Sequence, residues 1–121
     1  ISFFFFYAAA QVNLGSMYAE GQGGAPVDFQ QALKWYRQAA EQGYAPGCFN
    51  LGAIYAEGQG GIEQDLVMAY VWFSRAVVLG DEDALAAQKQ VGAQLTAAQR
   101  NQAQELLRKP ITQRPAHDFS K

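Results

Sequence analysis

The sequence has little of the chemistry that most enzymes and metal sites use. Its 121 residues include one cysteine, Cys48, and one histidine, His117, which are far apart in the chain. A single cysteine excludes an intrachain disulfide bond, and one cysteine with one distant histidine does not form a zinc-ligand pattern. No nucleophile stands in a recognisable pairing with a base. We therefore expect no catalytic site, no metal and no cofactor.

Charge is also scarce. Charged residues make up 17% of the chain and the formal net charge is −2. The basic residues are dispersed, so no basic patch favours nucleic acid or an anionic membrane surface. No apolar run reaches the roughly 20 residues of a membrane span. Half of the residues are apolar, however, which is enough to build a folded core.

The clearest positive signal is an internal repeat of 37 residues. Residues 7–43 and 44–80 align without a gap and are identical at 17 of 37 positions. The shared segments include Asn-Leu-Gly at 13–15 and 50–52, and Tyr-Ala-Glu-Gly-Gln-Gly-Gly at 18–24 and 55–61. A fixed period of this length is typical of helical solenoids.

Each unit is predicted to form two helices. Apolar residues three and four positions apart indicate helices over 8–20, 29–42, 45–57 and 66–79. Glycine-rich turns end the first helix of each unit, and Asp28 and Asp65 stand where a helix N-cap is expected. Gly15 and Gly52 lie inside helices, where glycine is unfavourable, so we expect two helix backbones to approach closely there.

The flanking segments differ from the repeat. Residues 81–109 are predicted to form two capping helices, the first reaching to about Leu95 and the second opened by Thr96 with Gln99 as its capping-box partner. Residues 110–121 are expected to form a flexible tail. The apolar segment 1–7 has two interpretations, which are a fragment edge and the remnant of a signal peptide. Under the second the protein is periplasmic or secreted, and otherwise cytoplasmic, so the compartment stays open.

These residues together resemble the Sel-1-like repeat (SLR), a relative of the tetratricopeptide (TPR) repeat. The resemblance covers residues 8–43 as one unit and 44–80 as a second. It implies an all-α fold, an α/α superhelix built as a right-handed solenoid, with its first helices on a concave face. It also implies an adaptor or scaffold that binds a protein or peptide partner. Two alternatives are a hydrolase of the β-lactamase-like kind credited to some family members, and a purely structural segment of a longer array.

By analogy with tetratricopeptide domains, one set of residues is expected on the concave face. Neither first helix contains Lys or Arg, so a cationic clamp for a peptide carboxylate is absent and the partner should be apolar or mildly basic. For Val12 and Phe49 the alternative of packing between repeats stays open. Tyr18, Tyr55 and the two tryptophans are interpreted as core residues. The predicted partner-binding residues are Val12, Asn13, Ser16, Glu20, Phe49, Asn50, Ala53 and Glu57.

Overall fold

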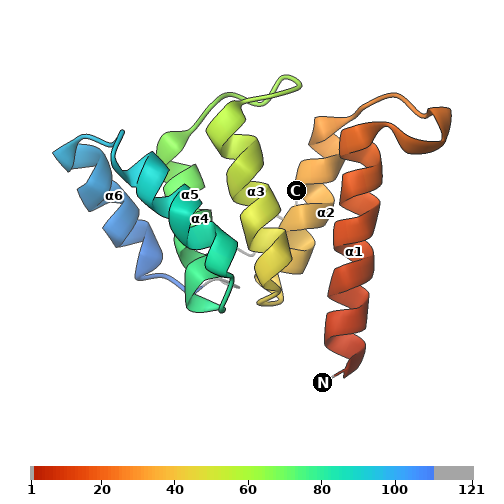
Figure 1. Ribbon diagram of the computed structural model, residues 1–121, viewed down its shortest axis with the longest axis horizontal. Coiled ribbons are helices and arrows are strands. Elements are labelled where there is room, and N and C mark those ends of the chain that lie inside the picture. The colour runs from red at the N-terminus through yellow and green to blue at the C-terminus, as the bar shows by residue number, and fades with distance from the viewer. Residues whose placement is uncertain (1, 111–121) are drawn as a thin grey trace, which may run out of the picture.

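The computed structural model describes residues 2–110, with side chains from residue 6 onward, and this part of the chain contains helices and no strand (Figure 1). Ile1 and residues 111–121, which include most of the predicted tail and His117, lie outside the described residues. The all-α expectation is confirmed. The elements are α1 (Ser2–Glu20), the short 3₁₀ turn η1 (Gln22–Gly24), α2 (Phe29–Glu41), α3 (Ala45–Glu57), α4 (Leu66–Val78), α5 (Glu82–Gly92) and α6 (Ala97–Leu107).

The main departure from the expected helix boundaries is at the N-terminus. Helix α1 begins at Ser2 rather than at residue 8, so Ser2–Tyr7 continues the first helix of unit one instead of forming a separate segment. Helix α5 ends at Gly92, three residues before its predicted end near Leu95. The other boundaries agree within two residues, which is the usual scatter at helix ends.

The predicted N-caps are all present. The carboxylates of Asp28 and Asp65 accept hydrogen bonds from the backbone N–H three residues on, at 3.1 and 3.0 Å. Each aspartate also donates its own backbone N–H to the carbonyl of a tyrosine, Tyr18 or Tyr55, at 2.8 Å. The loop of each unit is therefore tied back to its first helix by one repeated bond. Thr96 and the residue three positions on form the reciprocal capping box that was expected for α6.

The two helices of each unit meet where an aromatic ring rests on a glycine. A Cβ added at Gly15 would lie 2.8 Å from the ring of Tyr36, and one added at Gly52 would lie 2.8 Å from the ring of Phe73. The expectation of a close approach is correct, but the main neighbour is a side chain rather than a second backbone. Because the two rings are 37 residues apart, both hairpins close by the same contact.

The two units stack through α2 and α3. Here two backbones do approach, since a Cβ at Gly47 would lie 2.8 Å from the backbone nitrogen of Ala40. Leu51, Cys48 and Trp72 are fully buried at this junction. Trp72 also carries the guanidinium groups of two arginines over its ring, at 4.9 and 5.7 Å from the centroid. The interpretation of Trp72 as a core residue is therefore confirmed.

Helices α5 and α6 both pack on α4 and supply the third layer (Figure 1). A buried cluster of Val67, Val71, Leu95 and Ala103 joins α4 to α6. Arg75 adds a polar link, because its Nη2 donates to the carbonyl oxygens of Leu106 and Lys109 at 3.1 Å each. The closing helices are thus anchored to unit two through α4, and α5 and α6 have little contact with each other.

Replacing Gly52 with alanine tests the glycine–aromatic contact. Helix propensity alone would make Gly52→Ala stabilising by about 1 kcal/mol. The clash with the Phe73 ring should reverse that sign and lower the free energy of unfolding by about 1–3 kcal/mol. Chemical denaturation measures this directly. In a Phe73→Leu background the same change should cost clearly less. A stabilised Gly52→Ala protein would contradict the assignment.

Arg75 offers a second test, of the link to α6. Arg75→Met keeps the length of the side chain but removes the donors to Leu106 and Lys109, and should lower the free energy of unfolding by roughly 1–3 kcal/mol. Amide hydrogen exchange in α6 should accelerate. The matched control is Arg108→Met, whose ion pair with Glu105 is exposed and should contribute less than about 0.5 kcal/mol. Equal effects of the two changes would refute the anchoring role.

Candidate functional site

A hollow of about 270 Å³ lies between α3 and α5, with α4 as its floor. The first helices α1, α3 and α5 share the face of the molecule that is turned to the viewer in Figure 1, so this hollow belongs to the face on which partner binding is expected. We call it the groove. Its lining residues are Ala53, Ala56, Glu57, Gln64, Leu66, Phe73, Ala87, Gln90, Val91 and Gln94.

The groove exists because small side chains flank it. Ala53 and Ala56 on α3 and Ala87 on α5 leave space between the two helices. The floor is apolar because Leu66 and Phe73 of α4 form it, and the Phe73 ring packs against Gly52. Glu57 and the glutamines bring carboxylate and amide groups to the same hollow. The arrangement is an apolar slot with polar groups around it, which suits an extended peptide better than a bound metal ion.

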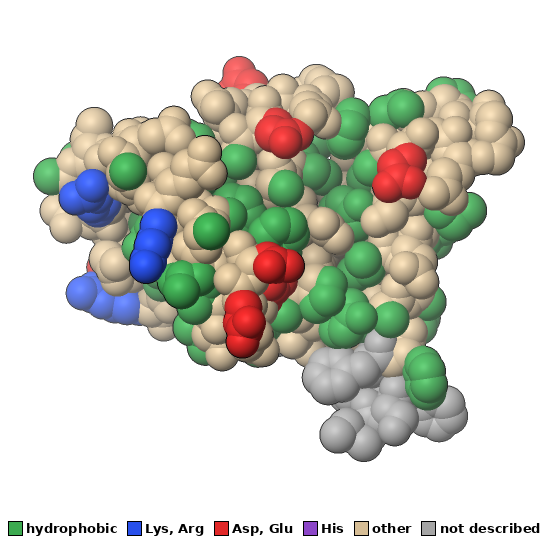
Figure 2. Space-filling view, in the orientation of Figure 1, with side chains coloured by type: hydrophobic (Ala, Val, Ile, Leu, Met, Phe, Trp, Pro, Cys, Tyr) green, Lys and Arg blue, Asp and Glu red, His purple; other side chains and the backbone are tan. Residues whose placement is uncertain are grey.

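This face carries a glutamate at the same position of each unit, held by the same hydrogen bond. Glu20 and Glu57 are exposed at the ends of α1 and α3. Each carboxylate accepts a hydrogen bond from a glutamine two residues on: Gln22 donates to Glu20 at 2.7 Å, and Gln59 donates to Glu57. Figure 2 shows acidic side chains spread over this face, with Lys and Arg confined to its α5–α6 end. The face therefore presents fixed negative charge beside α3.

The structure divides the predicted binding residues into two groups. Val12 packs against the main core, Phe49 lies 5.5 Å from Phe73 between ring centroids, and the Ser16 hydroxyl is 2.9 Å from the Tyr36 hydroxyl. Burial raises the pKa of Tyr36, although its hydrogen bond with Ser16 acts in the opposite direction. These three predicted residues therefore contribute to internal packing.

Three of the remaining five predicted residues are exposed. Asn13 is exposed like the two glutamates, and Asn50 is half-buried. Only Ala53 and Glu57 line the groove itself. Residues of α4 and α5 also line the groove, and none of them was predicted. The analogy with tetratricopeptide domains places only the first helices of the two units on the concave face.

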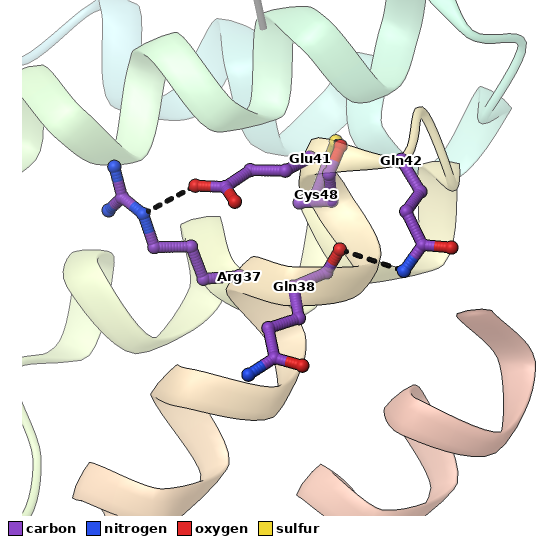
Figure 3. Close-up of polar contacts among 6 residues, drawn as sticks. Arg37, Gln38, Glu41, Gln42 and Cys48 are labelled. Carbon is purple, nitrogen blue, oxygen red and sulfur yellow. Dashed lines mark hydrogen bonds and ion pairs between the residues drawn. The ribbon is translucent and has the colours of Figure 1, made fainter. Parts of the chain in front are cut away.

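A larger hollow, which the sequence did not indicate, has a volume of about 450 Å³ and lies among α4, α5 and α6. It is bordered by Val77, Val78 and Leu79 at the end of α4. The available signal was the replacement of Ala-Glu-Gln at 40–42 in unit one by this apolar triplet in unit two. In unit one Glu41 pairs with an arginine instead, as Figure 3 shows.

Cys48 is the one thiol of the chain, and it is fully buried between α2 and α4. Burial, the largest influence, raises its pKa to about 12. Its sulfur points toward the α2 backbone, with Sγ 3.9 Å from the Ala40 carbonyl oxygen (Figure 3). A neutral, enclosed thiol is a poor nucleophile and a poor metal ligand. Among residues 2–110 no three His, Cys, Asp or Glu residues are grouped as metal ligands would be.

Comparison with known families supports the repeat assignment. The family model described as Sel1 repeat matches residues 8–44 and 45–81. The chain belongs to the Sel1 repeat family. Sel1-repeat proteins are generally protein–protein interaction modules and typically non-catalytic repeat scaffolds. A search of curated proteins found no match. None of the helices that the structure describes has the length and apolarity required to cross a membrane.

Two solved structures share the Sel1-repeat fold. The antigen c5321 of uropathogenic Escherichia coli, described as a protective antigen with an SLR fold, is 39% identical with a TM-score of 0.77. The match covers 83% of this chain but 21% of c5321. A Sel1 repeat protein from Oxalobacter formigenes is 24% identical with a TM-score of 0.58, over 81% of this chain and 88% of that one. The solenoid expectation is therefore confirmed.

The buried thiol gives this Sel1-repeat chain a pH dependence that can be measured. The folded state holds the Cys48 proton more tightly than the unfolded state. The contribution of this thiol to the free energy of unfolding is therefore fully present below the unfolded pKa of 9.0 and is lost as pH rises toward about 12. The limiting slope is about 1.4 kcal/mol per pH unit. Denaturation of wild type and Cys48→Ala between neutral and alkaline pH isolates this effect in their difference. Rapid maleimide labelling of the folded wild type would contradict the burial.

Proposed function

We propose that this chain is an adaptor or scaffold module that binds an extended segment of a protein partner in the groove. The observation that supports the proposal is the hollow between α3 and α5, which combines an apolar floor with carboxylate and amide groups. Sel1-repeat proteins generally act through protein–protein contacts, and that general role is consistent with a groove of this form.

The groove favours a particular chemistry in the partner. Phe73, Leu66 and the flanking alanines suit one apolar side chain. Gln90 and Gln94 on the α5 side carry amide groups that match the backbone of an extended peptide. Glu57 is exposed beside them, so a Lys or Arg next to the apolar anchor would be favoured and an acidic residue disfavoured.

A non-catalytic role forms part of the same proposal. The buried Cys48 thiol has a raised pKa, which is unsuitable for a nucleophile, and no metal-ligand cluster lies within residues 2–110. The groove residues instead offer shape, amide groups and one negative charge.

Selection of peptides from a displayed random library, with this chain as the immobilised target, tests the groove. Peptides selected from a random library should share an apolar residue next to Lys or Arg. Ala53→Arg, which fills the hollow and adds positive charge, should weaken their binding roughly tenfold or more. Glu57→Lys should also weaken the binding of these peptides, because it places a positive charge beside their Lys or Arg.

The matched control is Glu63→Lys, which makes the same charge change at an exposed loop position outside the groove. Its binding should stay near that of wild type. Thermal melting of each variant separates lost binding from lost folding. If the selected peptides bind Ala53→Arg and wild type equally, the groove is not the binding site.

A further inference from the structure

The hollow of about 450 Å³ among α4, α5 and α6 is lined by apolar side chains where unit one has polar ones. Val78 is 84% exposed and Leu79 is 43% exposed. Their counterparts in unit one, Glu41 and Gln42, are half-buried, and Glu41 pairs with Arg37 at 3.1 Å (Figure 3). The repeat itself therefore does not require apolar residues at these two positions. Exposed apolar residues that are grouped together commonly mark a binding surface.

The walls of this hollow are held in place by contacts of their own. The ring of Tyr70 rests on α5, where a Cβ added at Gly92 would lie 2.9 Å from it. Nε2 of Gln88 donates a hydrogen bond to the Ser74 hydroxyl at 2.8 Å. Arg75 holds the end of α6 through two backbone carbonyls. The volume lies within the roughly 300–1,000 Å³ of small-molecule sites, and a site with fixed walls loses little entropy on binding.

The charge on this hollow is positive, in contrast to that of the groove. Arg75 and Lys109 line it, and the described residues that line it include no Asp or Glu. Arg75 is half-buried, and neither of the two ion pairs among the described residues includes it. Burial, the largest influence, lowers the pKa of Arg75. A carboxylate in the hollow would supply the anion that this guanidinium lacks.

The hollow offers few free polar groups, which disfavours a buried peptide. Each residue of a peptide carries an N–H and a C=O that need hydrogen-bond partners once water is excluded. Ser74 and Gln88 already bond to each other, and Nη2 of Arg75 donates to two backbone carbonyls. A hydrocarbon chain needs no such partners and matches the apolar lining. That lining includes Val77, Val78, Leu79 and Leu107.

We propose that this hollow binds a free straight-chain carboxylate of the fatty-acid kind, at a site separate from the groove. The hydrocarbon chain lies against Val77, Val78 and Leu107, and the carboxylate lies beside Arg75 and Lys109. The two hollows then differ in ligand because the groove carries a carboxylate and amide groups, whereas this hollow combines cations with an apolar wall.

Calorimetric titration of the full chain with octanoate, kept below its micelle concentration, tests this site. Wild type should bind one octanoate per chain. Octanol, which has the same chain without the charge, should bind at least about tenfold more weakly. Val78→Glu places a carboxylate on the hollow and should weaken octanoate binding roughly tenfold or more. The control is Leu85→Glu, the same kind of change at a residue that is 42% exposed and outside the hollow, which should bind octanoate as wild type does. Circular dichroism shows whether each variant is folded.

Methyl NMR spectra recorded during the same titration locate the ligand. Octanoate should shift the methyl signals of Val77 and Leu107, which line the hollow. The signals of Val27, an exposed residue in the loop of unit one, should stay unchanged. Shifts at Val91 of the groove in place of those in the hollow would overturn the proposal.

Three further outcomes would also overturn it. The first is wild type that binds no octanoate or binds octanol equally well. The second is Val78→Glu that binds octanoate as tightly as wild type. The third is binding that appears only after Ile111 and Phe119 are both changed to serine, because the segment after Lys109 would then be the occupant of the hollow.

Discussion

Both hairpins of the molecule depend on an aromatic ring that rests on a helical glycine. Tyr36 occupies this place in unit one and Phe73 in unit two, each within 2.8 Å of where a Cβ would stand. The contact lets the two helices approach closely, and the rest of the architecture follows from that spacing. Phe73 becomes the floor of the groove, and the Tyr36 hydroxyl reaches Ser16. One packing constraint thus forms the core and shapes the surface above it.

The same backbone carries different side-chain chemistry in the two units. In unit one Gln11 is buried and bonded to Gln38 and Gln42, at 2.9 and 2.5 Å. Cys48 and Arg75 occupy the positions of the first two in unit two. The arginine turns outward to the carbonyls at the end of α6 instead of bonding within its own unit. Substitution at equivalent positions therefore converts an internal hydrogen-bond network into a link to the cap.

The closing helices show where the repeat logic ends. The loop between α5 and α6 spans 93–96, whereas the corresponding loop of unit two spans 58–65. The shorter connection starts α6 earlier in the repeat register, and α6 packs on α4 rather than pairing with α5. This displacement leaves the end of α4 partly uncovered and creates the larger hollow beside Val78.

The sequence alone determined the family, the caps of the helices and the helical segments, apart from the extension of α1 to Ser2. These depend on short-range signals, which are apolar spacing, aspartates and Thr96 at helix starts, and glycines at helix ends. Within the two units, the same signals recur 37 residues later in the sequence. Only the tertiary structure decided which of the predicted residues pack internally and which line the groove. Ser16 and Phe49 turned inward because an aromatic side chain of the following helix lies within reach of each, whereas Glu57 joined residues of α5 that no local pattern connects to it. The groove depends on distances between helices, and a sequence pattern fixes periodicity along a helix but not the gap between two of them.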